Sequence, residues 1–391
     1  MKKRFFPYFL IITILIGLFG VSIPIEASGK PFRVIVTFDD GVNKTAQNAL
    51  LNKAGLTLKK LDLVNGAVVL LPDKVKANEL LTHVGIKSVE EDIEIYALKS
   101  IGGGKIITPP AQTLECGVNK IDAELAHTTT TGSGIKVAIL DTGIDKNHAD
   151  LSIAGGVNFV VKRGSVNPSD WNDDNGHGTH VAGIVSALNN NIGVLGVAPD
   201  ASLYAVKVLD RRGTGYLSDV ISGLEWAINN NMDVVNMSLG TSSDVQALHN
   251  AVDIATSAGV ILVAASGNSG DGNSLTNNVE YPAKYSSVIA VGATNSSDTV
   301  PSWSSDGLEV EVVAPGVAIR STYKGNSYAT LSGTSMATPH VTGVIALMLS
   351  AQILPNDVRT LLSATSKDLG TPGFDVFYGN GLVNAARAVG L

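Results

Sequence analysis

Three short stretches of the sequence place a reactive side chain among small residues. Asp141 follows an apolar run in VAILDTGID, His177 lies in NGHGTHVAG, and Ser335 lies in LSGTSMATPHVTG. A serine hydroxyl is a poor nucleophile unless a neighbouring base takes its proton. An imidazole does this near neutral pH, and a carboxylate can fix the tautomer of that imidazole. The three side chains, in one of the chain orders known for such a group, therefore predict nucleophilic catalysis.

Each of these residues taken alone has a simpler explanation. An aspartate after a strand and a serine before a helix commonly form turns or helix caps. His177 and His180 could also be a metal pair, since residues three apart lie near one face of a helix. A zinc peptidase would need a third protein ligand and a glutamate after the first histidine, where this chain has Gly178. We therefore expect His177 to transfer protons and His180 to pack or form a hydrogen bond behind the site.

The elements that must position these side chains form an α/β pattern in residues 111–391. Apolar runs without clean alternation are typical of parallel strands that are covered on both faces, and helical patterns lie between them. We therefore expect a doubly wound, mostly parallel sheet with its ligand site beyond the carboxyl ends of the strands. The predicted strands are residues 135–140, 201–209, 232–239, 259–266 and 287–293.

A smaller α+β unit is expected before this domain. FRVIVTF predicts a strand, TAQNALLNKAG a helix, LDLVNGAVVLL two short strands around Asn65 and Gly66, VKANELLTHV a second helix and IKSVEEDIEIYA a last strand. The order βαββαβ is that of a ferredoxin-like domain. The following KSIGGGKIITPPAQ is rich in glycine and proline and predicts an exposed linker. The expected segments are 1–28, 29–98, 99–110 and 111–391.

The first segment, residues 1–28, has the pattern of a secretory signal peptide. It combines a basic start, a long apolar run and the small residues Ala27 and Ser28 at a plausible cleavage point. The alternative is a retained membrane anchor, since the apolar run approaches spanning length. We expect removal of the segment and secretion, without a stable association of the mature protein with a membrane.

The overall composition argues against several other classes. A net charge of −7 gives no indication of nucleic-acid binding, which requires a basic surface. Because Cys116 is the one cysteine of the sequence, the chain can form neither an internal disulfide nor a thiolate metal cluster. We expect Cys116 to be a small buried apolar residue.

The three chemical stretches resemble the active-site blocks of the subtilisin family of serine proteases (subtilases, peptidase S8). ALNNNIGVLGVAPDASLYAVKVL, LEWAINNNMDVVNMSLG and YGNGLVNAARA also read as subtilisin-like, so the resemblance spans nearly all of residues 111–391. It implies that Ser335 attacks the peptide carbonyl, that His177 acts as general base and then general acid, and that Asp141 orients His177. It also implies that Asn268 in AASGN and the backbone N–H of Ser335 stabilise the oxyanion.

The resemblance implies that a polypeptide substrate binds as an extended strand between two exposed edges. Leu217 would help to line the pocket for the fourth residue before the cleaved bond. Glu280 occupies a position at the bottom of the primary specificity pocket that is usually small in relatives, so its carboxylate predicts a preference for Lys or Arg. The alternative is that Glu280 turns out to solvent. The residues expected to bind substrate are Gly213, Gly215, Leu217, Ser238, Leu239, Gly240 and Glu280.

The stretch ALNNNIGVLG reads as a polar loop inserted into a helix, and the resemblance implies that it holds a calcium ion. Carbonyl, amide and carboxylate oxygens are ligands that Ca²⁺ accepts. The alternative is a plain surface loop. The implied ligands are Gln112, Asp150, Leu188, Asn190, Ile192 and Val194.

Residues 29–98 resemble the inhibitory propeptide of the family (inhibitor I9 type), which implies that they inhibit the protease and template its folding. The alignment places a processing cut near Leu98, with Lys99 and Lys105 as further candidates. The sequence therefore predicts a secreted, calcium-stabilised, monomeric serine endopeptidase that is made as a self-processing zymogen. The alternatives are a processing protease of narrow specificity and an inactive peptide-binding module. The complete set of catalytic residue types argues against the inactive module.

Overall fold

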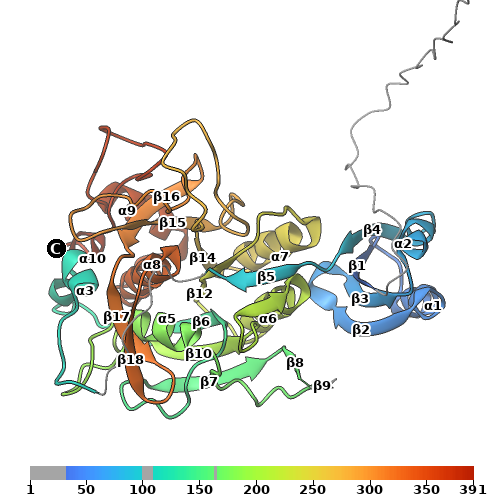
Figure 1. Ribbon diagram of the computed structural model, residues 1–391, viewed down its shortest axis with the longest axis horizontal. Coiled ribbons are helices and arrows are strands. Elements are labelled where there is room, and N and C mark those ends of the chain that lie inside the picture. Colours follow the sequence, from blue (N-terminus) through green and yellow to red (C-terminus); the bar gives the residue numbers. More distant parts are fainter. Residues whose placement is uncertain (1–31, 99–108, 163–164) are drawn as a thin grey trace, which may run out of the picture.

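The computed structural model describes residues 32–98, 109–162 and 165–391. The predicted signal peptide and all but the end of the predicted linker lie outside these residues. The described residues form a large unit and a small unit that lie side by side, and one extended segment of the small unit reaches across the large one (Figure 1).

The large unit is built on a sheet of seven strands in the order β16-β15-β14-β12-β6-β10-β7, all of whose pairings are parallel. All four residues of the central strand β12 are buried, as expected for a sheet with helices on both faces. This confirms the predicted doubly wound parallel sheet. The strands are β6 (Lys136–Asp141), β7 (Ile153–Asn158), β10 (Ser202–Lys207), β12 (Val234–Met237), β14 (Ile261–Ala265), β15 (Ile289–Thr294) and β16 (Val310–Pro315).

The sequence prediction missed the two edge strands of this sheet, β7 and β16. β7 contains two consecutive glycines, which lower strand propensity. One of them is required by packing, because a Cβ on Gly156 would lie 2.6 Å from the carbonyl oxygen of Ala205. The predicted strand at residues 232–239 was too long, since β12 ends at Met237 and Leu239–Gly240 forms β13 in another sheet.

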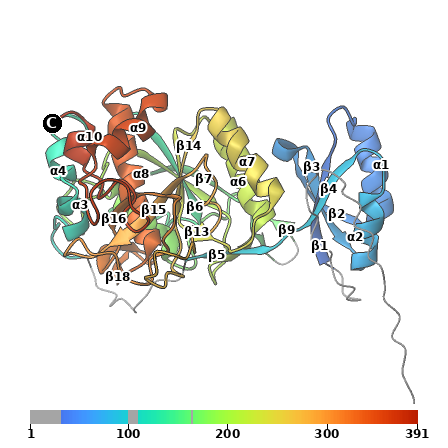
Figure 2. The ribbon, with the colours of Figure 1, turned by 90° about the horizontal axis from the view of Figure 1, so that it is seen from above.

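Two pairs of helices cover the large sheet. α5 and α8 pack together, and every residue of α5 is buried. α6 and α7 also pack together, on the side that faces the small unit (Figures 1 and 2). The helices are α3 (Cys116–Lys120), α4 (Ala123–Ala126), α5 (His177–Ser186), α6 (Leu217–Asn229), α7 (Gln246–Ser257), α8 (Thr334–Ser350), α9 (Pro355–Thr365) and α10 (Ala385–Ala388).

Short strands surround the large sheet and shape its edges. β17 (Ile319–Tyr323) and β18 (Ser327–Leu331) form an antiparallel hairpin that packs beside α5. A second hairpin consists of β8 (Val161–Lys162) and β9 (Ser165–Val166). β11 (Thr214–Tyr216) and β13 belong to a three-stranded sheet whose middle strand comes from the N-terminal part of the chain.

The small unit is an antiparallel sheet in the order β2-β3-β1-β4 with two helices, which is the ferredoxin-like arrangement. The prediction of a strand at the start of LDLVNGAVVLL was wrong, because Asp62–Val64 forms a 3₁₀ turn and Asn65 adopts a left-handed conformation with φ 49°. The elements are β1 (Phe32–Phe38), α1 (Lys44–Ala54), β2 (Leu56–Leu61), β3 (Gly66–Leu71), α2 (Lys74–Leu81) and β4 (Ile86–Glu91).

The predicted last strand of this unit is in fact two strands that serve different sheets. β4 pairs with β1 in the small unit, whereas β5 (Glu94–Ala97) lies between β11 and β13 of the large unit. The break falls at Asp92, whose buried carboxylate accepts hydrogen bonds from the backbone N–H and the hydroxyl of Ser218, both at 2.9 Å. A turn toward the large unit at this residue ends the pairing with β1 and starts the pairing with β11.

Candidate active site

Asp141 and His177 form a buried pair at the carboxyl ends of the strands. Asp141 ends β6, and His177 begins α5 after Gly176, whose φ is 115°. Nδ1 of His177 lies 2.8 Å from Oδ2 and 2.9 Å from Oδ1 of Asp141. The helix start can approach the strand end because residue 178 is glycine; a Cβ there would lie 2.2 Å from the carbonyl oxygen of Gly143.

The charge state of His177 is set by two opposing effects. Burial disfavours the protonated ring, but the Coulombic attraction and hydrogen bond of Asp141, together with the charge of Asp173, outweigh it, and the pKa of His177 is raised. Among the residues that the structure describes, the buried Nε2 of His177 has no hydrogen-bond partner. The pair thus has the orientation expected of a base, with Nδ1 on the carboxylate and Nε2 left for another group.

Ser335 lies in the first turn of α8, where its hydroxyl contacts two backbone carbonyls. Oγ lies 3.3 Å from the carbonyl oxygen of Leu98 and 3.1 Å from that of Ser238. Pro339 has no N–H for the carbonyl of Ser335 four residues earlier, and the hydroxyl of Ser238 donates to that carbonyl instead, at 2.9 Å. Ser238, which sequence reasoning placed at a substrate edge, also holds the start of α8.

Asn268 lies beside the same helix start. Its Oδ1 accepts hydrogen bonds from the backbone N–H of Thr334 at 2.9 Å and from its hydroxyl at 3.0 Å. These bonds fix the side-chain amide and direct Nδ2 away from Thr334, because only the oxygen can accept. A Cβ on Gly333 would lie 3.2 Å from this Nδ2, so the glycine keeps open the space in front of the amide.

Strand β5 occupies the position between the two predicted substrate edges. The N–H of Ala97 donates to the carbonyl of Gly213 at 2.8 Å, and Gly215 pairs with Ile95. On the other side Leu239 and Gly240 of β13 pair with Ala97 and Tyr96. Ile95 is fully buried and the strand runs antiparallel to both neighbours, so the chain binds itself as a peptide would by strand addition.

The glycines of this groove are required by close approach. A Cβ on Gly215 would lie 2.1 Å from the carbonyl oxygen of Val208, and one on Gly213 would lie 3.2 Å from Cβ of Ala97. Gly213 also has a φ of 74°, which favours glycine. Leu217 is fully buried at the start of α6, and its N–H donates to the carbonyl of Ile93 at 3.0 Å.

Glu280 lies next to Leu98, the last described residue of the segment that contains β5. A Cβ on Gly240 would lie 2.6 Å from Oε2 of Glu280 and 3.1 Å from Cδ2 of Leu98, which brings these three residues together. The hydroxyl of Ser269 donates to Oε1 at 2.9 Å. Burial raises the pKa of Glu280, and the bond from Ser269 opposes the shift only in part.

The predicted calcium ligands also come together, at the end of α5 remote from His177. Oδ1 of Asp150 accepts from Nδ2 of Asn190 at 2.8 Å, and Oδ2 accepts from the N–H of Val194 at 3.0 Å. The amide of Gln112 donates to the carbonyl of Leu188 at 2.6 Å. Ile192 forms a bridge to Ala111, and its N–H donates to Oδ1 of Asn190 at 2.7 Å.

This group is rich in oxygen but poor in charge. Asp150 is its one carboxylate, and no group of three or more His, Cys, Asp or Glu that could hold a metal occurs among the described residues. Asp150 is completely buried, and its side-chain hydrogen bonds come from neutral groups. The arrangement fits Ca²⁺, which accepts carbonyl and amide oxygens beside a carboxylate, once each amide turns its oxygen inward.

His180 is a buried ring behind the site, as its prediction states. Burial and the neighbouring His177 lower the pKa of His180 to about 3, and its Nε2 lies 3.1 Å from the carbonyls of Ile319 and Ala329. The ring is therefore a neutral donor that joins α5 to the β17–β18 hairpin.

The prediction that Cys116 is buried was wrong: it is exposed, because Gly117 is the residue of α3 that packs inward, against His340.

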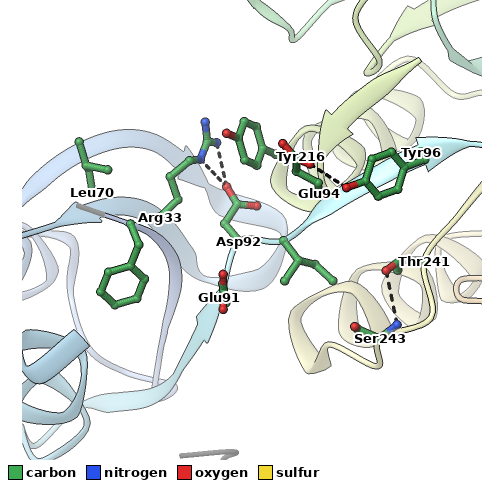
Figure 3. Close-up of a pocket in the computed structure, with 11 residues that line it drawn as sticks. Arg33, Leu70, Glu91, Asp92, Glu94, Tyr96, Tyr216, Thr241 and Ser243 are labelled. Atoms are coloured by element: carbon green, nitrogen blue, oxygen red, sulfur yellow. Dashed lines mark hydrogen bonds and ion pairs between the residues drawn. The ribbon is translucent and has the colours of Figure 1, made fainter. Parts of the chain in front are cut away.

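The small unit contacts the large one through charged side chains that sequence reasoning did not identify. Arg33 pairs with Asp92 at 2.8 Å, and its guanidinium lies 3.6 Å from the centre of the Tyr216 ring. Figure 3 shows these side chains around a cavity of about 610 Å³ between the units, with Tyr96 and Glu94 of β5 on its far side. Alternating patterns in the sequence could not reveal them, since each partner is distant in the chain.

A serine hydroxyl in contact with a peptide carbonyl, and a histidine paired with aspartate, are groups that serine peptidases use. The chain belongs to the subtilase family, whose sequence model matches residues 132–381, and it is a serine endopeptidase. It is 42% identical to subtilisin E of Bacillus subtilis over 397 aligned positions, which cover 99% of each chain.

Two further relatives match over shorter lengths. The thermostable alkaline protease of Halalkalibacterium halodurans is 49% identical over 311 positions, covering 79% of this chain and 81% of that one. The subtilisin of Bacillus pumilus is 50% identical over 281 positions, covering 71% of this chain and 99% of the relative. No helix within the described residues is long and apolar enough to cross a membrane.

Proposed function

We propose that this subtilase is a secreted zymogen in which Asp141, His177 and Ser335 form the catalytic triad that first cuts the chain's own backbone. One observation carries the proposal: the carbonyl of Leu98 lies 3.3 Å from Oγ of Ser335, at the end of a strand bound as a substrate would be. The atom at this distance is the carbonyl oxygen, so Oγ contacts the peptide group whose carbon it would attack.

In the proposed reaction Oγ of Ser335 attacks the carbonyl carbon and transfers its proton to Nε2 of His177. Asp141 keeps the proton of Nδ1 in place and stabilises the imidazolium. The oxyanion receives hydrogen bonds from Nδ2 of Asn268 and the N–H of Ser335, at the N-terminal end of α8 where the helix dipole favours negative charge. His177 then protonates the leaving amine, and water hydrolyses the acyl-enzyme by the reverse sequence.

The test is the maturation of the Ser335→Ala chain. The wild-type chain should label at Ser335 with a fluorophosphonate probe and should yield a mature protein lacking residues 29–98. The variant should accumulate as an uncut precursor. N-terminal sequencing of the secreted wild-type protein locates the cut, which we propose after Leu98, with Lys99 and Lys105 as further sites before the catalytic domain at 111–391. A variant that matures normally in a protease-deficient host would refute the proposal.

We propose that the small unit inhibits the enzyme and templates its folding. In the described parts of the chain, α6 and α7 receive no hydrogen bond from their own N-cap side chains. Asp92 caps α6 through the N–H of Ser218, and Glu90 caps α7 through the N–H groups of Gln246 at 2.8 Å and Ala247 at 3.1 Å. The small unit thus stabilises both helices while β5 fills the substrate groove.

We propose that Glu280 favours Lys or Arg before the cleaved bond, since a partly buried carboxylate in the pocket attracts a cation. Leu98 shows that an apolar side chain also fits beside it. Peptides that differ only in Arg, Lys, Phe or Leu at this position test the preference. Glu280→Gly should lower kcat/KM for Arg and Lys, with Ser269→Ala as the control that removes only the hydroxyl on the carboxylate. A preference of the wild-type enzyme for Phe and Leu would contradict the idea.

We propose that Gln112, Asp150, Leu188, Asn190, Ile192 and Val194 hold a structural Ca²⁺. The bound ion would cross-link the segment that follows α5 to the segment around Gln112. It would act on stability and leave the chemistry at Ser335 to the protein groups.

We also propose export to the cell exterior and a monomeric mature enzyme that acts on polypeptides. The signal-like residues 1–28 support export. A precursor that inhibits itself would also have no proteolytic activity until it leaves the cell. The second candidate is a processing protease of narrow specificity, which Glu280 would favour. Digestion of casein compared with cleavage of single-site precursors distinguishes the two.

A further inference from the structure

A lysine that the proposed chemistry does not use is buried directly beside Asp141. Lys207 ends β10 and pairs with Asp141 in the register of the parallel sheet, and only 6% of its side chain is exposed. Its ammonium donates to the carbonyl of Thr142 and to Oδ1 of Asp174, the latter at 2.8 Å. A buried charge is costly unless it is paired and hydrogen-bonded, so these two contacts define where the ammonium lies.

Thr142, one of the two partners of Lys207, bonds both to Asp141 and to the first turn of α5, which begins at His177. Its N–H donates to Oδ1 of Asp141 at 2.6 Å, and its Oγ1 accepts from the N–H of Gly178 at 2.9 Å. The same hydroxyl donates to Asp173 at 2.9 Å. With Lys207 on its carbonyl, every polar group of Thr142 is bonded, so its position fixes the carboxylate of Asp141 relative to the start of α5.

The other partner, Asp174, belongs to the loop that leads into His177. The neighbouring Asp173 ties this loop to α5, because it accepts from the N–H of Gly176 at 2.8 Å and of Thr179 at 3.0 Å. Lys207 therefore connects the end of the strand that carries Asp141 with the loop that precedes His177. Asp141 and His177, two of the three proposed catalytic residues, therefore belong to segments that the ammonium of Lys207 joins.

We propose that Lys207 is a positioning residue of the peptidase reaction, which joins the Asp141–Thr142 turn to the Asp174 loop and offsets the negative charge around His177. The proposal rests on the proposed roles of Asp141 and His177. The titratable groups that face His177 are Asp141 at the end of β6, Asp173 in the preceding loop and His180 on α5. His180 stays neutral, and two lysines reach the loop before His177: Lys207 binds the carboxylate of Asp174, and Lys324 donates to the backbone carbonyl of Asp174 at 2.8 Å. Of these two, Lys207 is the one that also contacts Thr142.

The decisive test compares Lys207→Met with Asp174→Asn, each expressed as the full chain and assayed after maturation with a chromogenic peptide. Lys207→Met should lower kcat about tenfold or more, with KM changed less than about twofold. The reason is that the change alters the positions of Asp141 and His177 but leaves the substrate-binding strands in place. It should also move the acid limb of kcat/KM to higher pH by about half a unit, since loss of a cation favours protonated His177.

Asp174→Asn should move the acid limb in the opposite direction, because it removes a negative charge and leaves the ammonium on Thr142. A purely structural role would not predict opposite shifts. Asp174 is 41% exposed, so this variant keeps the proposal testable if Lys207→Met fails to mature. Lys207→Arg should recover part of the lost kcat, since it keeps the charge and the donors.

The matched control is Lys146→Met. Lys146 lies in the loop that follows Asp141 and Thr142, and its ammonium contacts the carbonyl of Ser169 at 2.7 Å. This substitution should leave kcat and the acid limb unchanged. An unchanged kcat and pH profile in mature Lys207→Met, or shifts of the same sign in Lys207→Met and Asp174→Asn, would overturn the proposal. Failure of the wild-type enzyme to label at Ser335 would instead refute the triad itself, so the two failures are distinguishable.

Discussion

The two sheets of the molecule are covered in different ways. Both faces of the large sheet are covered by helices of the large unit, whereas the small sheet has α1 and α2 on one face only (Figure 2). Its other face, which includes Ile35 and Val68, joins the hydrophobic cluster of the large unit. The small unit therefore completes its core by docking, since a domain of this size buries too little apolar surface to be strongly stable alone.

The polar contacts show the same difference as the apolar cores: those of the small unit are completed by the large unit. Asp141 and His177 of the large unit bond to each other, whereas Asp92 and Glu90 of the small unit bond to backbone N–H groups of α6 and α7. The large unit is thus organised around its chemistry and the small unit around its contact with the large one. Changes confined to one unit should therefore separate these two roles.

Ser335→Ala should lower peptide hydrolysis by at least about 10⁴-fold while both units stay folded and joined. The reason is that the change removes the nucleophile without disturbing a core. Activity on a chromogenic peptide and circular dichroism of the precursor provide the two measurements. Thr338→Ala, a change of another hydroxyl in the same helix, serves as the control and should retain activity. Loss of folded structure in Ser335→Ala would show that the chemistry and the cores are not separable.

Removal of calcium should destabilise the large unit alone. Chelation with EDTA should reduce its unfolding free energy by about 3 kcal/mol relative to a solution with calcium at a hundred times its dissociation constant. Calorimetry of the inactive Ser335→Ala protein avoids autolysis. Asp150→Asn should lower the stability in calcium and remove most of the EDTA effect. A melting temperature that EDTA leaves unchanged would argue against a structural ion.

Asp92→Ala should weaken docking of the small unit by about 2 kcal/mol, or roughly thirtyfold in its inhibition constant. The change leaves the N–H of Ser218 without its cap and Arg33 without its carboxylate. The measurement is inhibition of mature enzyme by added residues 29–98. Lys76→Ala, which removes an exposed ion pair with Glu79, is the control and should leave inhibition unchanged. Equal inhibition by both variants would contradict a role of Asp92 in docking.

Acid should destabilise the large unit more than the small one. Burial is the main cause that lowers the pKa of His180 to about 3 and of His340 to about 4, below the ordinary value of 6.5. The unfolded chain then binds more protons than the folded one, so stability is lost as pH falls below about 6.5. Each histidine contributes up to about 1.4 kcal/mol per pH unit. Urea unfolding of the Ser335→Ala protein at pH 7, 6 and 5 measures the slope, and a flat profile would contradict it.

The sequence was informative where a pattern is local. Apolar runs located five of the seven strands of the large sheet, and small residues around Asp141, His177 and Ser335 marked the turns that carry them. It failed where the reason for a residue lies far along the chain. The end of β4 at Asp92 depends on Ser218, and the burial of Lys207 depends on Thr142 and Asp174. Neither periodicity nor spacing records such partners.

The position of β5 has a consequence for timing. While the bond after Leu98 is intact, the blocking strand is tethered to the groove, and a tether of this kind corresponds to an effective concentration of about millimolar or more. After the proposed cut at this bond, the same strand would compete as a separate molecule whose occupancy falls on dilution. We therefore expect the lag before proteolysis appears to depend on enzyme concentration and to shorten when a trace of mature enzyme is added to digest the released strand.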